Sequence, residues 1–234
     1  MKNLILWLLF PISQIACGQL IYDESFQDSS FQDFKLELSN AIQQRDTTIL
    51  KGLMADRVYE SKDTCGYPGC SPTDIIKYYF MENAEESWEI MELQMRFGFS
   101  RLSGNKKAHG LGRQENWDDE IIFQAPSYLK NMDSENELIV LGEAVRIRKK
   151  PDIQSEVIRK ASFEKFSCDC NIIDMNDETY VFANGMQWVQ IELPDRQKGY
   201  VASKLTSREI YKEMTVAKIN GTWKIVSWFQ PPGC

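Results

Sequence analysis

Six cysteines are the residues of this sequence with the most evident chemistry, and four of them stand in two close pairs. Cys65 and Cys70 flank a Gly/Pro turn in "CGYPGC", while Cys168 and Cys170 form "CDC"; Cys17 and Cys234 stand alone. A Gly/Pro turn brings its two ends together, so we expect a local disulfide between Cys65 and Cys70. Four thiolates suit zinc, but neither pair has the usual C-x-x-C spacing, and we predict no metal site. The pairing of Cys168, Cys170 and Cys234 stays open.

Other side chains that could perform catalysis are few. The one histidine, His109, lies between Lys and Gly residues in "KKAHGLGR" and reads as an exposed loop residue, without a cysteine nucleophile placed to use it. The acids of "ENWDDE", from Glu115 to Glu120, could provide paired carboxylates for sugar chemistry or ligands for calcium. No GxSxG elbow or Gly-rich phosphate loop is present in the sequence. The sequence therefore predicts a non-enzyme without a cofactor, with a hydrolase acting through these acids as the alternative.

The N-terminus has the pattern of an export signal. Lys2 precedes the apolar block "LILWLLFPI", which is short for a membrane span, and small residues follow in "IACGQ". We predict a signal peptide over residues 1–18, with cleavage after Gly18. The alternative is that Cys17 is lipidated, since the residues before it resemble the lipobox of bacterial lipoproteins. Either outcome places the protein outside the cytoplasm of a bacterium, in the periplasm or lipid-anchored to the envelope. The oxidising environment there favours disulfides.

Composition and charge exclude some classes of partner. Hydrophobic residues make up 43% of the 234 residues and charged residues 26%, which is typical of a folded globular protein. The formal net charge is −7, so non-specific binding to nucleic acid is not expected. The one basic run, Arg146 to Lys150, is too short to change that expectation, and we interpret it as a solvated face. A membrane contact is expected only through a lipid anchor at Cys17.

The elements that would position these residues change in type along the chain. Residues 19–137 are expected to form a mainly helical domain, with apolar residues at helical spacing in 29–46, 47–55, 71–80 and 86–99. The serine pair at 29–30 and Ser71 followed by Pro72 are expected helix starts, and Gly98 an expected stop. A strand is expected within 120–129 after a polar loop over 100–118.

From Leu138 the sequence predicts short strands. Residues 138–207 have the rhythm of a small antiparallel barrel, and 208–234 predict a β-hairpin, because Asn220-Gly221 suits a type I′ turn. In "AVRIR" the alternation places Val145 inside and Arg146 and Arg148 outside. Pro151 then ends the strand, because proline cannot donate to a ladder. The predicted fold class is α+β.

Three motifs in residues 138–205 carry a resemblance to the bacterial SH3 (SH3b) domain. "VRIRKKPDIQSEVI" looks like the opening strand of that family, with Arg148 and Pro151 at its arginine and proline; "GMQWVQI" looks like the central strand, with Trp188; "KGYVASKL" resembles the closing Gly-aromatic signature, with Tyr200. The link "CDCNIIDMNDETYVFAN" is longer than the family pattern. The resemblance implies an SH3-like barrel whose candidate ligand-binding residues are Arg148, Trp188 and Tyr200. That the two aromatic residues are barrel core stays an alternative.

A second resemblance concerns the C-terminus. "NGTWKIVSW" looks like the last strands of NTF2-like domains, which implies that the hairpin pairs back onto the N-terminal domain and that the barrel is an insertion. Together these features predict an exported, non-enzymatic binding or scaffold protein. Its barrel would contact a peptidoglycan peptide or an envelope protein. A structural or inhibitory lipoprotein is a further alternative.

Overall fold

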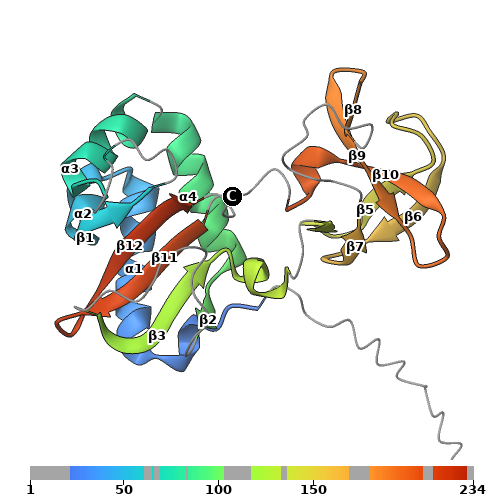
Figure 1. Cartoon of the computed structure of the whole chain (residues 1–234). Coiled ribbons are helices and arrows are strands. Elements are labelled where there is room, and N and C mark those ends of the chain that lie inside the picture. Colours follow the sequence, from blue (N-terminus) through green and yellow to red (C-terminus); the bar gives the residue numbers. More distant parts are fainter. Residues whose placement is uncertain are drawn as a thin grey trace, which may run out of the picture.

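The chain folds as an α+β protein with two β-sheets and four α-helices in its described parts (Figure 1). The computed structural model describes residues 22–60, 65, 69–82, 84–102, 117–132, 136–168, 180–207 and 213–230, and of residues 117–121 and 229–230 the backbone alone. The predicted signal peptide, Cys17, His109, Cys170 and Cys234 lie outside these residues.

The first sheet takes its strands from both ends of the chain. Their order is β1 (Met54–Tyr59), β12 (Thr222–Gln230), β11 (Glu213–Ile219), β3 (Trp117–Ala125), β2 (Ser100–Leu102). β1 runs parallel to β12 and the other pairs are antiparallel. Asn220 and Gly221 both have positive φ, 49° and 77°, so the β11–β12 turn is the two-residue turn that Asn-Gly predicts.

Helices cover one face of this sheet, and we call the assembly the helix-covered unit (Figure 1). The helical segments are η1 (Ser25–Gln27), α1 (Ser29–Gln44), α2 (Thr47–Gly52), α3 (Pro72–Ile75), the π-helical η2 (Ile76–Met81), α4 (Ala84–Phe97) and η3 (Ser127–Asn131). A helix starts after Ser71, as the sequence predicts, and Ser71 and Asp74 form a reciprocal capping box at the start of α3. The cap of α1 is Asp28, whose carboxylate accepts from the backbone N–H of Phe31, and not the serine pair. No described helix is long and apolar enough to cross a membrane.

The core between helices and sheet is built from aromatic rings. Phe31 of α1 is fully buried and stacks on Phe123 of β3 at a centroid distance of 3.7 Å, with the edge of Trp223 at 5.1 Å. At the other end of the sheet, Trp228 stacks on Phe80 at 4.7 Å. Rings from α1 and η2 on one side and from β3 and β12 on the other therefore hold the helices onto the sheet.

The segment before α1 is attached to the edge of the same sheet. The Glu24 N–H donates to the Phe99 carbonyl at 2.7 Å, and the Glu24 carboxylate accepts from the Arg101 N–H and from Lys130. Burial raises the pKa of the Asp23 carboxyl, but hydrogen bonds from Lys35, Ser25 and the backbone of Phe99 outweigh it and hold that pKa below its usual value.

The second sheet is curled into a half-barrel, which we call the curled unit (residues 136–207, Figure 1). Its order is β4 (Glu137–Ile139), β7 (Lys165–Ser167), β9 (Met186–Glu192), β10 (Lys198–Ala202), β5 (Val145–Arg148), β6 (Val157–Ala161); β8 (Tyr180–Ala183) pairs with β9, and the 3-10 turn η4 (Ser203–Leu205) follows β10. As the alternation predicts, Val145 and Ile147 lie in its core, whereas Arg146 is exposed.

A small apolar cluster lies where the two units meet. It contains Phe97 of α4, Tyr128 of η3, Ile139 of β4 and Leu141, all buried. The Lys165 ammonium also donates to the Asn131 carbonyl at 3.3 Å, across the same junction. The curled unit is thus joined to the helix-covered unit by packing as well as by chain connections.

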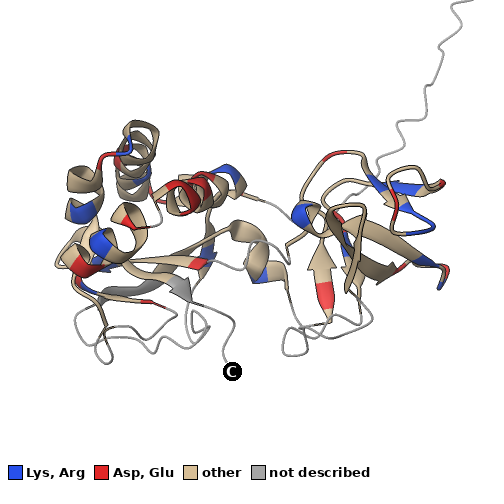
Figure 2. Ribbon diagram, turned by 90° about the horizontal axis from the view of Figure 1, so that it is seen from above, with Lys and Arg blue, Asp and Glu red and all other residues tan. Residues whose placement is uncertain are grey.

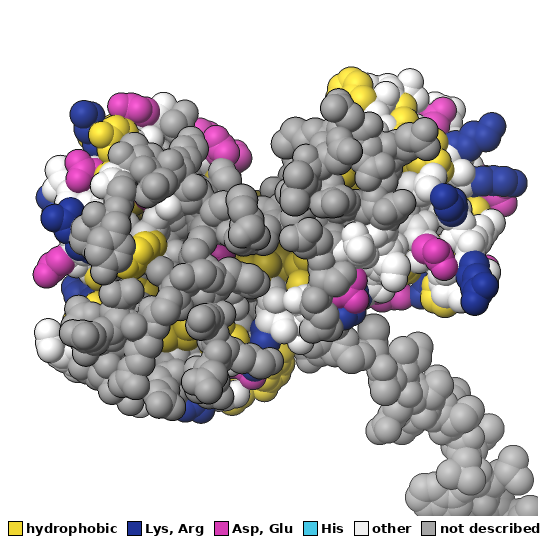
Figure 3. All heavy atoms as spheres, viewed as in Figure 1, with side chains coloured by type: hydrophobic (Ala, Val, Ile, Leu, Met, Phe, Trp, Pro, Cys, Tyr) yellow, Lys and Arg dark blue, Asp and Glu magenta, His cyan; other side chains and the backbone are white. Residues whose placement is uncertain are grey.

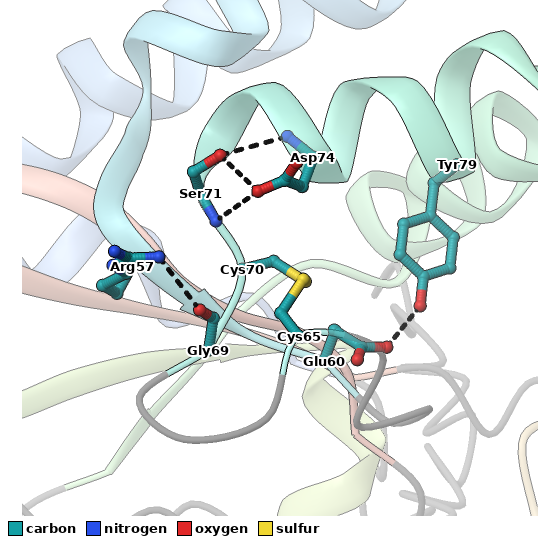
Figure 4. The surroundings of a disulfide bond; sticks show 8 residues. All are labelled: Arg57, Glu60, Cys65, Gly69, Cys70, Ser71, Asp74 and Tyr79. Atoms are coloured by element: carbon teal, nitrogen blue, oxygen red, sulfur yellow. Dashed lines mark hydrogen bonds between the residues drawn. A yellow bond between two sulfur atoms is a disulfide. The ribbon is translucent and has the colours of Figure 1, made fainter.

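The predicted disulfide between Cys65 and Cys70 is present, with the two Cα atoms 5.1 Å apart (Figure 4). Cys70 exchanges two backbone hydrogen bonds of 2.9 Å with Val58 of β1, and Ser71, the next residue, caps α3. The bridge therefore ties the loop after β1 to the start of α3. Cys168 is disulfide-bonded as well. Within the described residues no cluster of His, Cys, Asp or Glu could hold a metal ion.

Replacing both Cys65 and Cys70 by serine should lower the free energy of unfolding by about 2 kcal/mol, because a short loop then gains freedom in the unfolded chain. Urea unfolding monitored by circular dichroism measures the difference. Both proteins are kept without reducing agent, so that the wild-type disulfide stays intact. The variant should keep an m-value close to that of the wild type, since opening a loop of so few residues adds little surface to the unfolded chain. An unchanged urea midpoint would contradict the prediction.

Candidate binding site

Two of the three predicted ligand-binding residues lie side by side on the outer face of the curled sheet. Tyr200 of β10 is in register with Arg148 of β5 on one side and with Gln190 of β9 on the other. The alternate residues Val189 and Val201 are buried in the core of the unit, so the row Arg148–Tyr200–Gln190 faces outward. The curled sheet thereby brings together residues from three strands.

Hydrogen bonds fix the side chains of this row. The Gln190 amide donates to the Tyr200 hydroxyl at 2.6 Å, and the Arg148 guanidinium donates to the Ser155 carbonyl, also at 2.6 Å. Tyr200 and Arg148 are half-buried. A ring and a guanidinium held in this way lose little side-chain freedom on binding a ligand, so the row is a preorganised surface.

The third predicted residue, Trp188, is buried rather than offered to a ligand. Its side chain is 2% exposed and lies opposite Ala202 of β10 and Val181 of β8. Its Nε1 has no hydrogen-bond acceptor among the described residues. Trp188 is thus covered although it shares the outward face of β9 with Gln190, and it does not belong to the core cluster that contains Val189 and Ile191.

A polar cavity of about 440 Å³ adjoins Gln190. Its lining comes from four strands and the residues beside them: Asn136, Glu137, Ser167, Cys168, Gln190, Ile191, Glu192 and Lys198. Glu137, Ser167, Glu192 and Lys198 form one continuous register row across β4, β7, β9 and β10. Sequence reasoning missed this row, although the alternation of Gln190 and Glu192 with apolar neighbours carried a signal of an outward polar face.

The cavity holds charges of both signs. Glu137 is paired with Lys165 at 3.2 Å. Glu192 and Lys198 are exposed cross-strand neighbours, and neither is in an ion pair within the described part of the chain. A free carboxylate, a free ammonium and an amide suit a ligand with charged ends and hydrogen-bonding groups between them, such as a peptide.

The alternative acidic site cannot be placed. Glu115 lies outside the described residues, and of Asp118, Asp119 and Glu120 the structure describes the backbone in β3 without the side chains. The same holds for the lipidation candidate Cys17, which lies outside the described residues. Both stay predictions of the sequence.

Comparisons with known proteins give no significant match to a family model, to a curated protein or to a solved structure. The resemblance to SH3b and NTF2-like domains thus rests on the motifs in the sequence. What the site can bind follows from its own residues and their arrangement.

Proposed function

We propose that this is an exported, non-enzymatic binding protein whose curled unit, an SH3b-like barrel, contacts a cell-wall peptide or a periplasmic protein partner. The observation that supports this proposal is the fixed outer row Arg148–Tyr200–Gln190 beside a polar cavity. Export rests on the signal-like N-terminus of the sequence.

A peptide fits this surface better than a compact small molecule does. The cavity is at the small end of ligand pockets in volume, and it is lined by polar more than by apolar groups. Tyr200 beside it provides a flat apolar ring with a hydroxyl already held by Gln190. An extended ligand could lie over the ring and place a charged end in the cavity, which uses both parts of the surface.

In this proposal the helix-covered unit is an NTF2-like scaffold that holds the barrel as an insertion. Support comes from the position of β11 and β12 between β1 and β3, since these strands follow the curled unit in sequence. The buried cluster around Tyr128 and Ile139 supports a fixed presentation of the barrel. We infer a scaffold role because the core of this unit is filled by aromatic rings.

Co-sedimentation of residues 19–234 with purified peptidoglycan tests the wall-binding proposal. We expect the wild type to pellet and Tyr200→Ala to need at least about tenfold more peptidoglycan for half-maximal binding, because a central aromatic contact is typically worth more than 1 kcal/mol. Arg148→Ala should show a loss of similar size.

Phe182→Ala is the matched control, since Phe182 of β8 is 77% exposed in the same unit and lies away from the row. It should bind like the wild type. A wild type that stays in the supernatant at high peptidoglycan load would exclude the wall peptide as ligand. The next ligand to test would then be a periplasmic protein partner.

A further inference from the structure

Charge is unevenly divided along the chain. Residues 138–207 contain ten basic and ten acidic residues, so the whole net charge of −7 lies in the rest of the sequence. Four of those ten acids fall within 169–178, outside the described residues. Figure 2 shows Lys and Arg on both units, with acidic residues prominent on the helices of the helix-covered unit.

One cross-strand pair in this unit destabilises the pairing of its two strands. Arg146 of β5 and Lys160 of β6 are directly opposite each other in register, and both are exposed. Like charges in this position destabilise an antiparallel pair. Neither side chain is in an ion pair within the described residues.

The acidic side chains on either side of Lys160 do not compensate this pair, because other cations hold them, and Glu143, three residues before Arg146, is exposed and forms no ion pair with either member within the described residues. Glu164 is paired with Arg159, and Glu156 is paired with Lys149 at 3.4 Å. Arg146 and Lys160 are therefore left with excess positive charge in a chain that is acidic as a whole.

The pair continues into the row described above. Arg148 follows Arg146 at two residues on the same side of β5, and Tyr200 is the register neighbour of Arg148. We call Arg146, Arg148 and Lys160 the basic face. Figure 3 shows dark blue side chains projecting at the right-hand edge of the curled unit, with magenta side chains beside them.

We infer that the basic face recognises carboxylate groups on the ligand of the Arg148–Tyr200 row, so that the ligand is an anionic peptide. The inference rests on the proposed function, whose site it extends. Guanidinium groups bind carboxylates through two parallel hydrogen bonds, and a bound carboxylate between Arg146 and Lys160 would remove their repulsion. The same pair that costs stability in the free protein thus gives affinity in the complex.

The test compares peptidoglycan before and after its carboxylates are converted to amides with a carbodiimide and ammonia. Covalently attached phosphate polymers are first removed from both preparations with hydrofluoric acid, and a sample that keeps these polymers is tested beside them. We expect the wild type to bind native peptidoglycan at least about tenfold more tightly than the amidated form, and the preference to shrink as salt rises. Arg146→Gln/Lys160→Gln should lose that preference.

The control is Arg196→Gln/Lys204→Gln, which removes two exposed positive charges from other parts of the same unit. It should keep the preference for native peptidoglycan. The Arg146→Gln/Lys160→Gln variant should also be at least as resistant to urea as the wild type, because the repulsion is gone. If the variant lost binding because it is unfolded, its resistance to urea would be lower than that of the wild type.

The outcomes separate the inference from the proposed function. Equal binding of the wild type to native and amidated peptidoglycan would overturn the inference and leave wall binding standing. Binding only to walls that keep their phosphate polymers would assign the basic face to phosphodiesters and also overturn it. If the wild type binds no preparation, the proposal of wall binding is wrong, and soluble poly-L-glutamate then tests the basic face alone. Salt-sensitive binding of poly-L-glutamate that the Arg146→Gln/Lys160→Gln variant loses would support the inference. No binding of poly-L-glutamate would overturn it.

Discussion

Replacing Phe31 by alanine should lower the free energy of unfolding by about 3–5 kcal/mol, the range for removing a large buried aromatic side chain. Phe31 is fully buried and lies within 5.5 Å, centroid to centroid, of Phe34, Phe99, Phe123 and Trp223. These rings come from α1, the residue before β2, β3 and β12. The substitution would therefore open a cavity between the first helix and the sheet strands that lie far apart in sequence.

Phe26→Ala is the control for Phe31→Ala. It removes the same side chain five residues earlier, where the ring is 60% exposed, and should change stability by no more than about 0.5 kcal/mol. Urea unfolding monitored by circular dichroism gives both values. A loss below about 1 kcal/mol for Phe31→Ala would mean that the helix does not depend on this cluster for its place on the sheet.

Features determined by neighbouring residues could be predicted from the sequence. The helix start at Ser71, the end of α4 at Gly98 with φ 68°, the Asn220-Gly221 turn and the Cys65–Cys70 disulfide all follow the prediction. Each depends on a few adjacent residues whose backbone preferences or short covalent distance decide the outcome.

Features determined by distant partners could not be predicted in this way. Met54 has helical spacing with Leu50 and Leu53, yet it begins β1, where it is in register with Ile225 of β12. Residues 19–137, expected to be mainly helical with one strand within 120–129, also contribute β1 and β2 to a sheet that includes the C-terminal strands β11 and β12. Pairing with those strands outweighs the helical pattern, because it places Met54 and Val58 of β1 in the core between sheet and helices.

The candidate site shows the same division. Alternation within one strand was enough to place Arg148 outside. The cavity row from Glu137 to Lys198 needed the register of four strands, which no local pattern contains. Trp188 lies two residues from Gln190 and so faces outward from β9, yet its side chain is buried. The alternation of a strand therefore could not show whether this aromatic residue is exposed.

Replacing Gly199 by alanine should lower the free energy of unfolding of the curled unit by about 3 kcal/mol, the upper end of the range for overpacking a core. A Cβ at Gly199 would lie 2.6 Å from Cγ2 of Ile147 and 3.2 Å from Cδ1 of Ile158. The Ile147 methyl is fixed to a branched carbon in the core of β5 and cannot move aside without moving its strand. Glycine is thus needed here for the close approach of β10 to β5.

The same glycine controls the proposed binding row, because Tyr200 is the next residue and its partner Arg148 is next to Ile147. Separating β10 from β5 would pull these side chains apart, so Gly199→Ala should weaken peptidoglycan binding at temperatures where the variant is still folded. Gly52→Ala makes the identical chemical change at the end of α2, where a Cβ would meet nothing within 4 Å, and should be neutral or stabilising by less than about 1 kcal/mol. If the free energy of unfolding falls for Gly199→Ala but not for Gly52→Ala, and only Gly199→Ala loses binding, the ligand surface depends on the spacing of β10 and β5. A Gly199→Ala protein as stable as Gly52→Ala would show that β10 does not pack on β5 as described.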